Sequence, residues 1–157
     1  MIYKIKYILI ALFSSLFIGN IAYSDGHSGS FSFHTGWYFD GNVMVIDENN
    51  LMGTGFPKGA TFNDSGSGYL HNGEAQCVAT FTMNNGVGKA KGWCAWADND
   101  GDRLFTEFSG SAYNGENIIT GGTGKFAGWT GSGPWACEDL GKFGSSYCRQ
   151  TLNYTKP

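Results

Sequence analysis

The segment from residue 74 to residue 97 carries the pattern of a β-hairpin. Asn85-Gly86 lies at its centre, and this dipeptide is a strong signal for a two-residue type I′ turn between paired strands. Residues at equal distances from the turn face each other, so Cys77 lies opposite Cys94. Antiparallel alternation makes them a pair without backbone hydrogen bonds, with about 4.5 Å between Cα atoms. A disulfide accepts that separation, and we predict one between Cys77 and Cys94.

The same register sorts the side chains of the hairpin into two faces. The apolar face holds Ala75, Cys77, Ala79, Phe81 and Met83 opposite Gly88, Ala90, Gly92, Cys94 and Trp96. The polar face holds Thr80 and Thr82 opposite Lys91 and Lys89. This division is typical of paired strands with one buried and one solvated face. The hairpin is therefore expected in a sheet that has one side in the core.

Cys137 and Cys148 bracket a second turn, Gly141-Lys142-Phe143-Gly144, symmetrically. We predict that they join a second hairpin in the same way. On the loop-entropy model each bridge contributes about 3 kcal/mol. Because the sequence has no Cys-x-x-Cys pair, both bridges are interpreted as structural staples rather than redox centres.

Residues 1–24 have the order of a secretory signal. Two lysines precede an apolar run from Tyr7 to Ile18, and Ala22-Tyr23-Ser24 offers small residues for cleavage. The alternative is an uncleaved membrane anchor, which needs about 20 apolar residues, whereas Gly19 interrupts this run. We predict a signal peptide over 1–24, a single mature domain over 25–157, and a secreted or periplasmic location, where paired cysteines form disulfides.

The charge of the chain argues against two classes of partner. The chain has 10 basic and 13 acidic residues, and loss of the two leader lysines makes the mature domain more acidic. Nucleic acid binding calls for a basic face, and anionic lipid attracts basic segments. We expect no nucleic acid partner, and no membrane association after cleavage of the signal.

Glycine and aromatic residues together favour an all-β fold. The 25 glycines among 157 residues oppose helices, because glycine loses more backbone freedom on folding than any other residue. Patterning predicts strands near 43–47, 74–83, 87–97, 102–112, 117–121, 127–137 and 147–155, an alternating stretch near 30–34, and no clear period over 52–64. We predict an antiparallel up-and-down barrel of about eight strands, which leaves no sheet edge exposed. A β-sandwich is the alternative.

The densest glycine cluster runs from Gly121 to Gly133. No Gly-Lys-Ser/Thr stands in it and no helix is expected behind it, which argues against a phosphate-binding loop. The segment resembles the Gly-Gly-Thr/Ser-Gly-x-Phe-x-x-x-x-Gly stretch of the allene oxide cyclase and dirigent superfamily. The match is carried by Gly121, Gly122, Thr123, Gly124, Phe126 and Gly131.

This resemblance implies an eight-stranded antiparallel barrel with an apolar lumen, here in a secreted relative of bacterial type. In plants, such barrels steer the cyclisation or coupling of reactive lipophilic intermediates, mainly by confinement. The cysteine hairpins are not part of the family motif, and the plant catalytic residues have no position-by-position match in this sequence. We expect the glycine turn to fold Phe126 back as a plug at one barrel end.

The most acidic cluster is Asp98-Asn99-Asp100-Gly101-Asp102. Its alternating oxygens resemble a calcium loop, but Arg103 and Ser109 stand where an EF-hand has Gly and Glu. We interpret the segment as a hairpin turn built on Asp-Gly, and the sequence leaves weak calcium binding open.

A two-residue turn at Asp100-Gly101 sets the next register. Phe105 then opposes Trp96, and Glu107 opposes Cys94 on the apolar face. A carboxyl group buried there is a candidate general acid or base. The alternatives are that Glu107 pairs with Arg103 or a hydroxyl, or that a three-residue turn shifts the register and turns Glu107 to solvent.

The sequence leads to two hypotheses for function. In the first, an apolar lumen binds a small hydrophobic molecule, with Phe81, Trp96 and Phe105 as candidate ligand-binding residues, and a cyclase or isomerase reaction as a further step. In the second, the protein is a non-catalytic secreted binding or interaction module with a filled core. A lined pocket of about 300 Å³ or more favours the first hypothesis.

No motif for a metal or a cofactor stands out. The spacing of His27, His34 and His71 matches no metal site. We expect no metal and no cofactor, and the sequence leaves open whether the chain forms a homo-oligomer.

Overall fold

The computed structural model describes residues 26–140 and 144–157. The expected signal peptide and residues 141–143 of the second hairpin turn lie outside the described residues. The described elements are β1 (His27–Tyr38), β2 (Gly41–Val45), β3 (Leu51–Gly55), β4 (Lys58–Asn63), β5 (Gly73–Asn84), β6 (Val87–Ala97), β7 (Arg103–Ser111), β8 (Asn114–Gly122), the 3-10 helix η1 (Gly124–Phe126), β9 (Thr130–Asp139) and β10 (Ser145–Lys156). None of the helical structure in this part of the chain could span a membrane.

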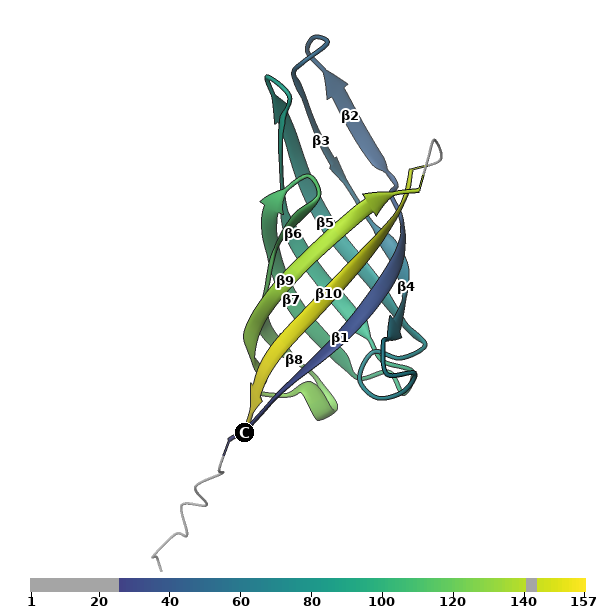
Figure 1. The fold of residues 1–157 in the computed structure, drawn as a ribbon, viewed down its shortest axis with the longest axis vertical. Coiled ribbons are helices and arrows are strands. Elements are labelled where there is room, and N and C mark those ends of the chain that lie inside the picture. The colour runs from purple at the N-terminus through teal and green to yellow at the C-terminus, as the bar shows by residue number, and fades with distance from the viewer. Residues whose placement is uncertain (1–25, 141–143) are drawn as a thin grey trace, which may run out of the picture.

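Eight of these strands close into an antiparallel barrel (Figure 1). Around the barrel the order is β5, β4, β1, β10, β9, β8, β7 and β6, and β6 pairs with β5 to complete the ring. A sandwich keeps two separate sheets, so closure rules out that alternative. The predicted barrel is confirmed.

The other two strands form a hairpin that rises above the barrel (Figure 1). β3 pairs with the upper part of β5, from Ala79 to Met83, and β4 pairs with the lower part of β5. The end with this hairpin is called the upper end below, and the end with the C-terminus is the lower end. The sequence pattern missed this arrangement over 52–64, because Phe56-Pro57 breaks one long strand into β3 and β4. Proline has no N–H to donate to a ladder.

Both predicted cysteine hairpins are confirmed. Cys77 faces Cys94 between β5 and β6, and Cys137 faces Cys148 between β9 and β10. Each pair forms a disulfide with 4.0 Å between its Cα atoms. Asn85 and Gly86 have φ values of 50° and 78°, and a type I′ turn requires positive φ at both central residues.

The predicted register between β6 and β7 was wrong by one residue. The turn has three residues, since the Asp98 N–H donates to the Asp102 carbonyl at 2.8 Å and the Gly101 N–H donates to the Asp98 carbonyl at 2.9 Å. Gly101 has a φ of 91°, which ends a three-residue loop of the type I plus bulge kind. The three-residue alternative is therefore the one that the chain adopts.

This shift by one residue moves two candidate site residues to the outside of the barrel. Cys94 faces Thr106 rather than Glu107, and Trp96 faces Leu104 rather than Phe105. Glu107 is exposed and Phe105 is 36% exposed. A one-residue slip exchanges the two faces of a strand, because side chains alternate with a period of two.

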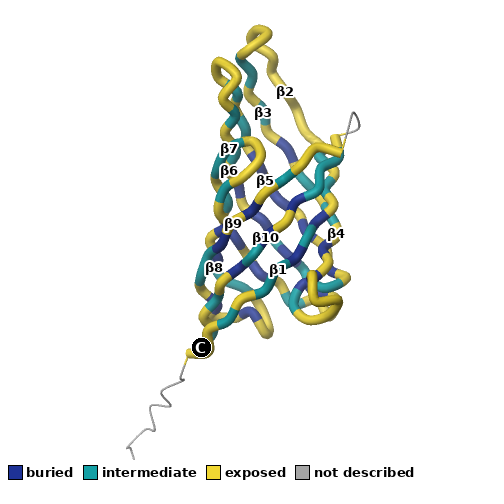
Figure 2. Tube along the Cα trace, in the orientation of Figure 1, coloured by how far each residue is buried: buried dark blue, intermediate teal, exposed yellow. Residues whose placement is uncertain are grey.

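Buried residues lie in the middle and lower parts of the barrel, whereas the tips at the upper end are exposed (Figure 2). The core cluster consists of Phe33, Leu70, Ala75, Cys77, Cys94, Trp96, Leu104, Ile119, Phe126, Trp129 and Leu152. Phe126 is fully buried and its ring centroid lies 5.0 Å from that of Trp129 in an edge-to-face pair. Phe126 thus closes the lower end as the glycine motif predicted.

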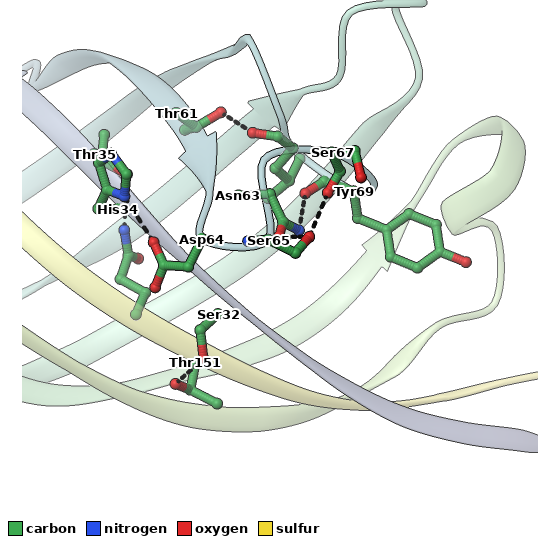
Figure 3. Close-up of polar contacts among 12 residues, drawn as sticks. Ser32, His34, Thr35, Thr61, Asn63, Asp64, Ser65, Ser67, Tyr69 and Thr151 are labelled. Carbon is green, nitrogen blue, oxygen red and sulfur yellow. Dashed lines mark hydrogen bonds and ion pairs between the residues drawn. The ribbon is translucent and has the colours of Figure 1, made fainter.

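A second plug at the lower end comes from the loop between β4 and β5 (Figure 3). Leu70 is fully buried although its φ of 58° is left-handed, a conformation that costs about 1–2 kcal/mol outside glycine. Thr61 Oγ1 donates to the Leu70 carbonyl at 2.7 Å, and Asn63 Nδ2 donates to the Tyr69 carbonyl at 2.9 Å. These bonds hold Leu70 inside the barrel.

The acidic cluster at the lower end is engaged by Lys125 of η1. Its Nζ lies 3.0 Å from Asp98 Oδ2 and also pairs with Asp100, while its backbone N–H donates to Asp102 Oδ2 at 2.9 Å. The hydrogen bond from Lys125 lowers the pKa of Asp100. Burial opposes the charge of Lys125, but its bonds to Asp100 and Asp98 outweigh burial and raise the pKa of the ammonium. The segment is a hairpin turn bonded to η1, and Lys125 supplies the positive charge among its carboxylates.

Candidate functional site

A cavity of about 530 Å³ occupies the upper half of the barrel. Inward-facing side chains from β1, β3, β5, β6 and β7 supply an apolar wall, formed by Trp37, Leu51, Ala79, Phe81, Met83, Ala90 and Phe108. The volume exceeds the value of about 300 Å³ that separates a ligand-sized pocket from a filled interior. The barrel is therefore solid below and hollow above.

Trp96 forms the floor of this cavity. It is 1% exposed, and its ring packs edge-on against Phe33 and Trp37, with centroids 5.3 and 5.5 Å away. Its Nε1 donates to Thr106 Oγ1 at 2.8 Å. The polar atom of this large buried ring therefore has the hydrogen-bond partner that burial requires. The structure thus places Trp96 in the lumen, where the sequence placed it.

The other two candidate ligand-binding residues lie in different places. Phe81 is on the cavity wall, where its ring meets Phe39 edge-on at 5.5 Å between centroids. Phe105 lies on the outer surface, beside Trp93 in a second hollow of about 620 Å³. That hollow lies over exposed side chains outside the barrel, so the register shift separates Phe105 from the lumen.

Both disulfides border the cavity. The Cys77–Cys94 bridge joins β5 to β6, and the Cys137–Cys148 bridge joins β9 to β10. In the ring order these two hairpins stand on opposite walls, with two strands between them on either side. The bridges therefore join neighbouring strands on opposing walls of the cavity, and Cys77 and Cys94 also belong to the core cluster below it.

A buried polar chain crosses one wall of the cavity. Asn117 Nδ2 donates to Gln150 Oε1 at 3.1 Å, and Gln150 Nε2 donates to Thr35 Oγ1 at 2.9 Å. Asn117 is 2% exposed and Gln150 is 5% exposed. Gly133 lies between them on β9, opposite Asn117, and a Cβ at this position would collide with the backbone of Thr151. Sequence reasoning missed these residues, although Gln150 shares the inward face of Cys148 by simple alternation.

Trp135 lies next to this polar chain. It faces Gln150 across the β9–β10 ladder and lines the cavity. It is 8% exposed, and its buried Nε1 has no hydrogen-bond partner among the described residues. An unpaired buried donor costs about 1–3 kcal/mol, and this nitrogen is closed off from the open space of the cavity.

The cavity lining is almost free of charge. Within residues 26–140 and 144–157, Asp139 is the lone charged residue of the lining, and it is exposed. Tyr113, which also lines the cavity, is 53% exposed. Both come from the upper turns, so the polar rim of the mouth gives way to neutral groups inside.

Glu107, the sequence-based candidate for acid–base chemistry, does not reach this cavity. It faces Trp93 on the outer side of the β6–β7 pair, and Trp93 is 57% exposed. The argument for Glu107 rested on burial in the apolar face, and the observed register removes that argument.

On the outer surface, His34 forms a polar pair with Asp64. Its Nδ1 lies 2.7 Å from Asp64 Oδ1 (Figure 3), and its ring stacks on Phe62 at 5.6 Å between centroids. This pair fixes the start of the β4–β5 loop, because the Asp64 N–H also donates to the Ser32 carbonyl at 2.9 Å. The described residues contain no group of three metal-ligating side chains.

Comparison with known proteins shows which known fold this barrel shares. No family model matches the sequence, and no curated protein matches it. Several solved structures are similar, and the pterocarpan synthase dirigent proteins PsPTS1 and GePTS1 are among them. PsPTS1 has a TM-score of 0.55 and 16% identity, covering 85% of this chain and 96% of its own. GePTS1 has a TM-score of 0.51 and 16% identity, covering 83% of this chain and 90% of its own.

The barrel has the dirigent fold. The resemblance seen in the glycine motif is thus confirmed at the level of the fold, which is what an identity of 16% can establish. In this dirigent-like barrel, the cavity lies inside the lumen, between the two disulfide-linked hairpins. Its lining residues, rather than those of other proteins, carry the functional argument.

Proposed function

We propose that the upper lumen binds one small, mainly apolar molecule. The observation that carries the proposal is the cavity of about 530 Å³, walled by Phe81, Met83, Leu51 and Phe108. Ligand pockets fall between about 300 and 1,000 Å³ and are mostly apolar with a few polar groups. The likeness of the fold to that of dirigent proteins supports the proposal, because dirigent barrels orient small molecules.

The favourable free energy of binding comes mainly from the burial of ligand surface. Each Å² of apolar area removed from water contributes about 25 cal/mol, and the wall is fixed by two disulfides. A wall that does not have to be ordered on binding loses little entropy. The lumen therefore favours compact apolar molecules over flexible ones.

If a reaction accompanies binding, it is a cyclisation or isomerisation by confinement. Asp139 is the lone charged lining residue in the described part of the chain, and it lies exposed at the mouth. Shape and exclusion of water are then the means by which the lumen selects one outcome of a reactive intermediate. The alternative function is binding without conversion.

The protein works outside the cytoplasm in this proposal. Two formed disulfides in a small domain are typical of an oxidising compartment, which agrees with the export signal expected over residues 1–24. The secreted or periplasmic location is tested by immunoblotting cell fractions and by the N-terminal sequence of the exported protein.

Two adjacent residues on opposite faces of β5 test the binding site. Ala79 lines the cavity, whereas Val78 points outward and is 49% exposed. Binding of the neutral dye N-phenyl-1-naphthylamine is measured by its fluorescence. Ala79→Trp fills the lumen and should abolish binding, while Val78→Trp adds the same ring outside and should bind like the wild type. Equal binding by both variants would show that the dye does not enter the lumen.

The natural ligand is sought by native mass spectrometry of the protein purified from its own source. A retained lipophile that is present in the wild type and absent from Ala79→Trp supports lumen binding. A ligand-free spectrum together with no dye binding would favour the second hypothesis, a binding or interaction module that works through its surface.

A further inference from the structure

The hollow of about 620 Å³ on the outer face of the barrel is a second place where a molecule could bind. Four apolar side chains of its lining stay partly exposed, with Trp93 at 57%, Phe56 at 53%, Val78 at 49% and Phe105 at 36%. Side chains alternate along a strand, so Trp93 points away from the lumen that its neighbour Cys94 borders. A contiguous exposed apolar patch on a small domain marks a binding surface.

Trp93 and Phe105 form an aromatic platform in this hollow. Trp93 on β6 faces Glu107 on β7, and Phe105, two residues earlier on β7, faces Ala95. Diagonal neighbours of this kind lie about 7–8 Å apart, so the two rings share one surface. The face of an aromatic ring carries partial negative charge, and it therefore attracts C–H groups that carry partial positive charge.

Polar side chains stand around the aromatic platform. Four exposed ones belong to the lining of the hollow: Asp40, Lys58, Gln76 and Thr120. Thr120 lies in β8 at a β-bulge, where the pairing with β7 shifts register between Phe105 and Thr106. Bulges re-aim side chains and are common beside functional sites. The rings are thus accompanied by an amide, a hydroxyl and one charge of each sign.

Two backbone hydrogen bonds fix the border of the hollow. The Phe56 N–H donates to the Asp40 carbonyl at 2.7 Å, and the Cys77 N–H donates to the Pro57 carbonyl at 2.9 Å. These bonds tie the link between β1 and β2 to the link between β3 and β4, and tie the latter to β5. A ligand that binds here meets a surface that is already formed, so little entropy is lost on binding.

The lining restricts the chemical class of that ligand. Sites for apolar molecules bury about 70–90% of the ligand, whereas the rings of this hollow stay open to water. Asp40 opposes an anion, and Lys58 opposes a cation. A peptide that adds as a strand needs an open sheet edge, but β5, β6 and β7 are paired on both sides. A molecule with C–H faces and uncharged hydroxyl edges matches both the rings and the polar groups.

We propose that the outer hollow binds an uncharged saccharide. One sugar ring stacks on Trp93 and Phe105, and its hydroxyl groups form hydrogen bonds with Gln76, Asp40 and Thr120. A sugar whose hydroxyl groups are all equatorial fits this platform, because an axial hydroxyl would hold the C–H face away from the aromatic rings. β-Linked glucose chains belong to this class. The site is independent of the lumen and adds a second binding activity to the proposed function.

Three tetrasaccharides with the same β-1,4 linkage test the class. Cellotetraose is uncharged, the tetramer of glucuronic acid is anionic, and the tetramer of glucosamine is cationic in mildly acidic buffer. Dissociation constants are measured in that buffer by titration calorimetry with the exported protein. We expect cellotetraose to bind, and both charged tetramers to bind about threefold more weakly, as repulsion between exposed charges allows.

Two matched variants test the platform. Phe105 and Phe62 are 36% and 37% exposed, but Phe62 lies on β4, where its ring stacks on His34. Phe105→Ala and Trp93→Ala should each lower the affinity for cellotetraose about tenfold, and Phe62→Ala should leave it unchanged. The wild type supplies a readout that needs no variant: the C–H proton resonances of the bound sugar should move upfield, because they lie over aromatic rings.

The outcomes separate this inference from the proposed function. If cellotetraose does not bind, or binds to Trp93→Ala as it does to the wild type, the saccharide site is overturned. If a charged tetramer binds most tightly, the uncharged class is overturned. Binding of poly-L-proline at Trp93 in place of cellotetraose would assign the hollow to a peptide and overturn the proposal. Ala79→Trp, which fills the lumen, should bind cellotetraose like the wild type, so failure of the outer site leaves lumen binding standing.

Discussion

The lower and upper halves of the barrel are built from the same strands but differ in the side chains that point inward. In the lower half the inward residues are large, with Phe33, Phe126, Trp129 and Leu152 at most 1% exposed. In the upper half β6 points Gly88, Ala90 and Gly92 inward, opposite Phe81 and Met83 of its partner β5. Along β6, the change from Trp96 below to glycine and alanine above therefore leaves room in the upper half.

The largest expected difference between the halves follows from removing one phenyl ring from each. Phe126→Ala empties a fully buried position and should lower the free energy of unfolding by about 3–5 kcal/mol. Phe81→Ala, at the cavity wall, removes a ring that already borders empty space and should cost about 1 kcal/mol. Urea unfolding measures both, and Phe126→Leu serves if Phe126→Ala does not fold. Equal losses would contradict the division into solid and hollow halves.

The next effect comes from the disulfide at the boundary between the packed core and the cavity. The double variant Cys77→Ala/Cys94→Ala should lose about 3 kcal/mol, since its loop spans 17 residues. Hydrogen exchange should then rise more in the upper parts of β5 and β6 than around Trp129. Exchange that rises evenly along the barrel would show that the bridges stabilise both halves alike.

A smaller effect is expected from adding the same side chain to each half. Ala75 is 2% exposed and contacts the packed core, so Ala75→Leu should cost about 1–3 kcal/mol through overpacking. Ala90 lines the cavity, and Ala90→Leu should change the free energy of unfolding by less than about 0.5 kcal/mol. Chemical denaturation compares the two, and a large loss in Ala90→Leu would mean that the upper half is closely packed in solution.

The smallest expected effect is a pH dependence of the free energy of unfolding, which comes from the lower half. Burial, followed by the influence of Tyr69, raises the pKa of the Tyr154 phenol. The folded state therefore favours the neutral phenol, and this contribution is present below the unfolded pKa, about 10, and is lost as pH rises above it. Tyr154→Phe keeps the stack on Trp129, whose centroid is 4.1 Å away, and should show a shallower fall in stability between about pH 9 and pH 11. Parallel curves for the two proteins would contradict this assignment.

The parts of the fold that could be predicted are those governed by local turns. Asn85-Gly86 selects one turn type, so its hairpin, its faces and its disulfide followed directly. Asp100-Gly101 fits either a two-residue or a three-residue loop, and the wrong choice moved Phe105 and Glu107 into the lumen. The alternation of side chains between the two faces of β7 offered a check on the register, because a carboxylate such as Glu107 is expected on the face toward solvent.

The parts that could not be predicted depend on contacts between distant segments. Leu70 sits in a loop without a pattern, and only the hydrogen bond from Thr61 shows why it enters the barrel. The Asn117–Gln150 pair joins residues on β8 and β10 across a glycine, and a single strand gives no sign of it. The cavity itself is a property of the whole ring, so its lining could be listed only once closure was known.

The plugs formed by Leu70 and Phe126 restrict the routes by which a molecule could reach the cavity. Because they fill the lower end in the described residues, the barrel is a cup with one mouth rather than a tube. If a molecule binds there as proposed, it enters and leaves past Tyr113, and a product that dissociates slowly would delay the binding of the next molecule.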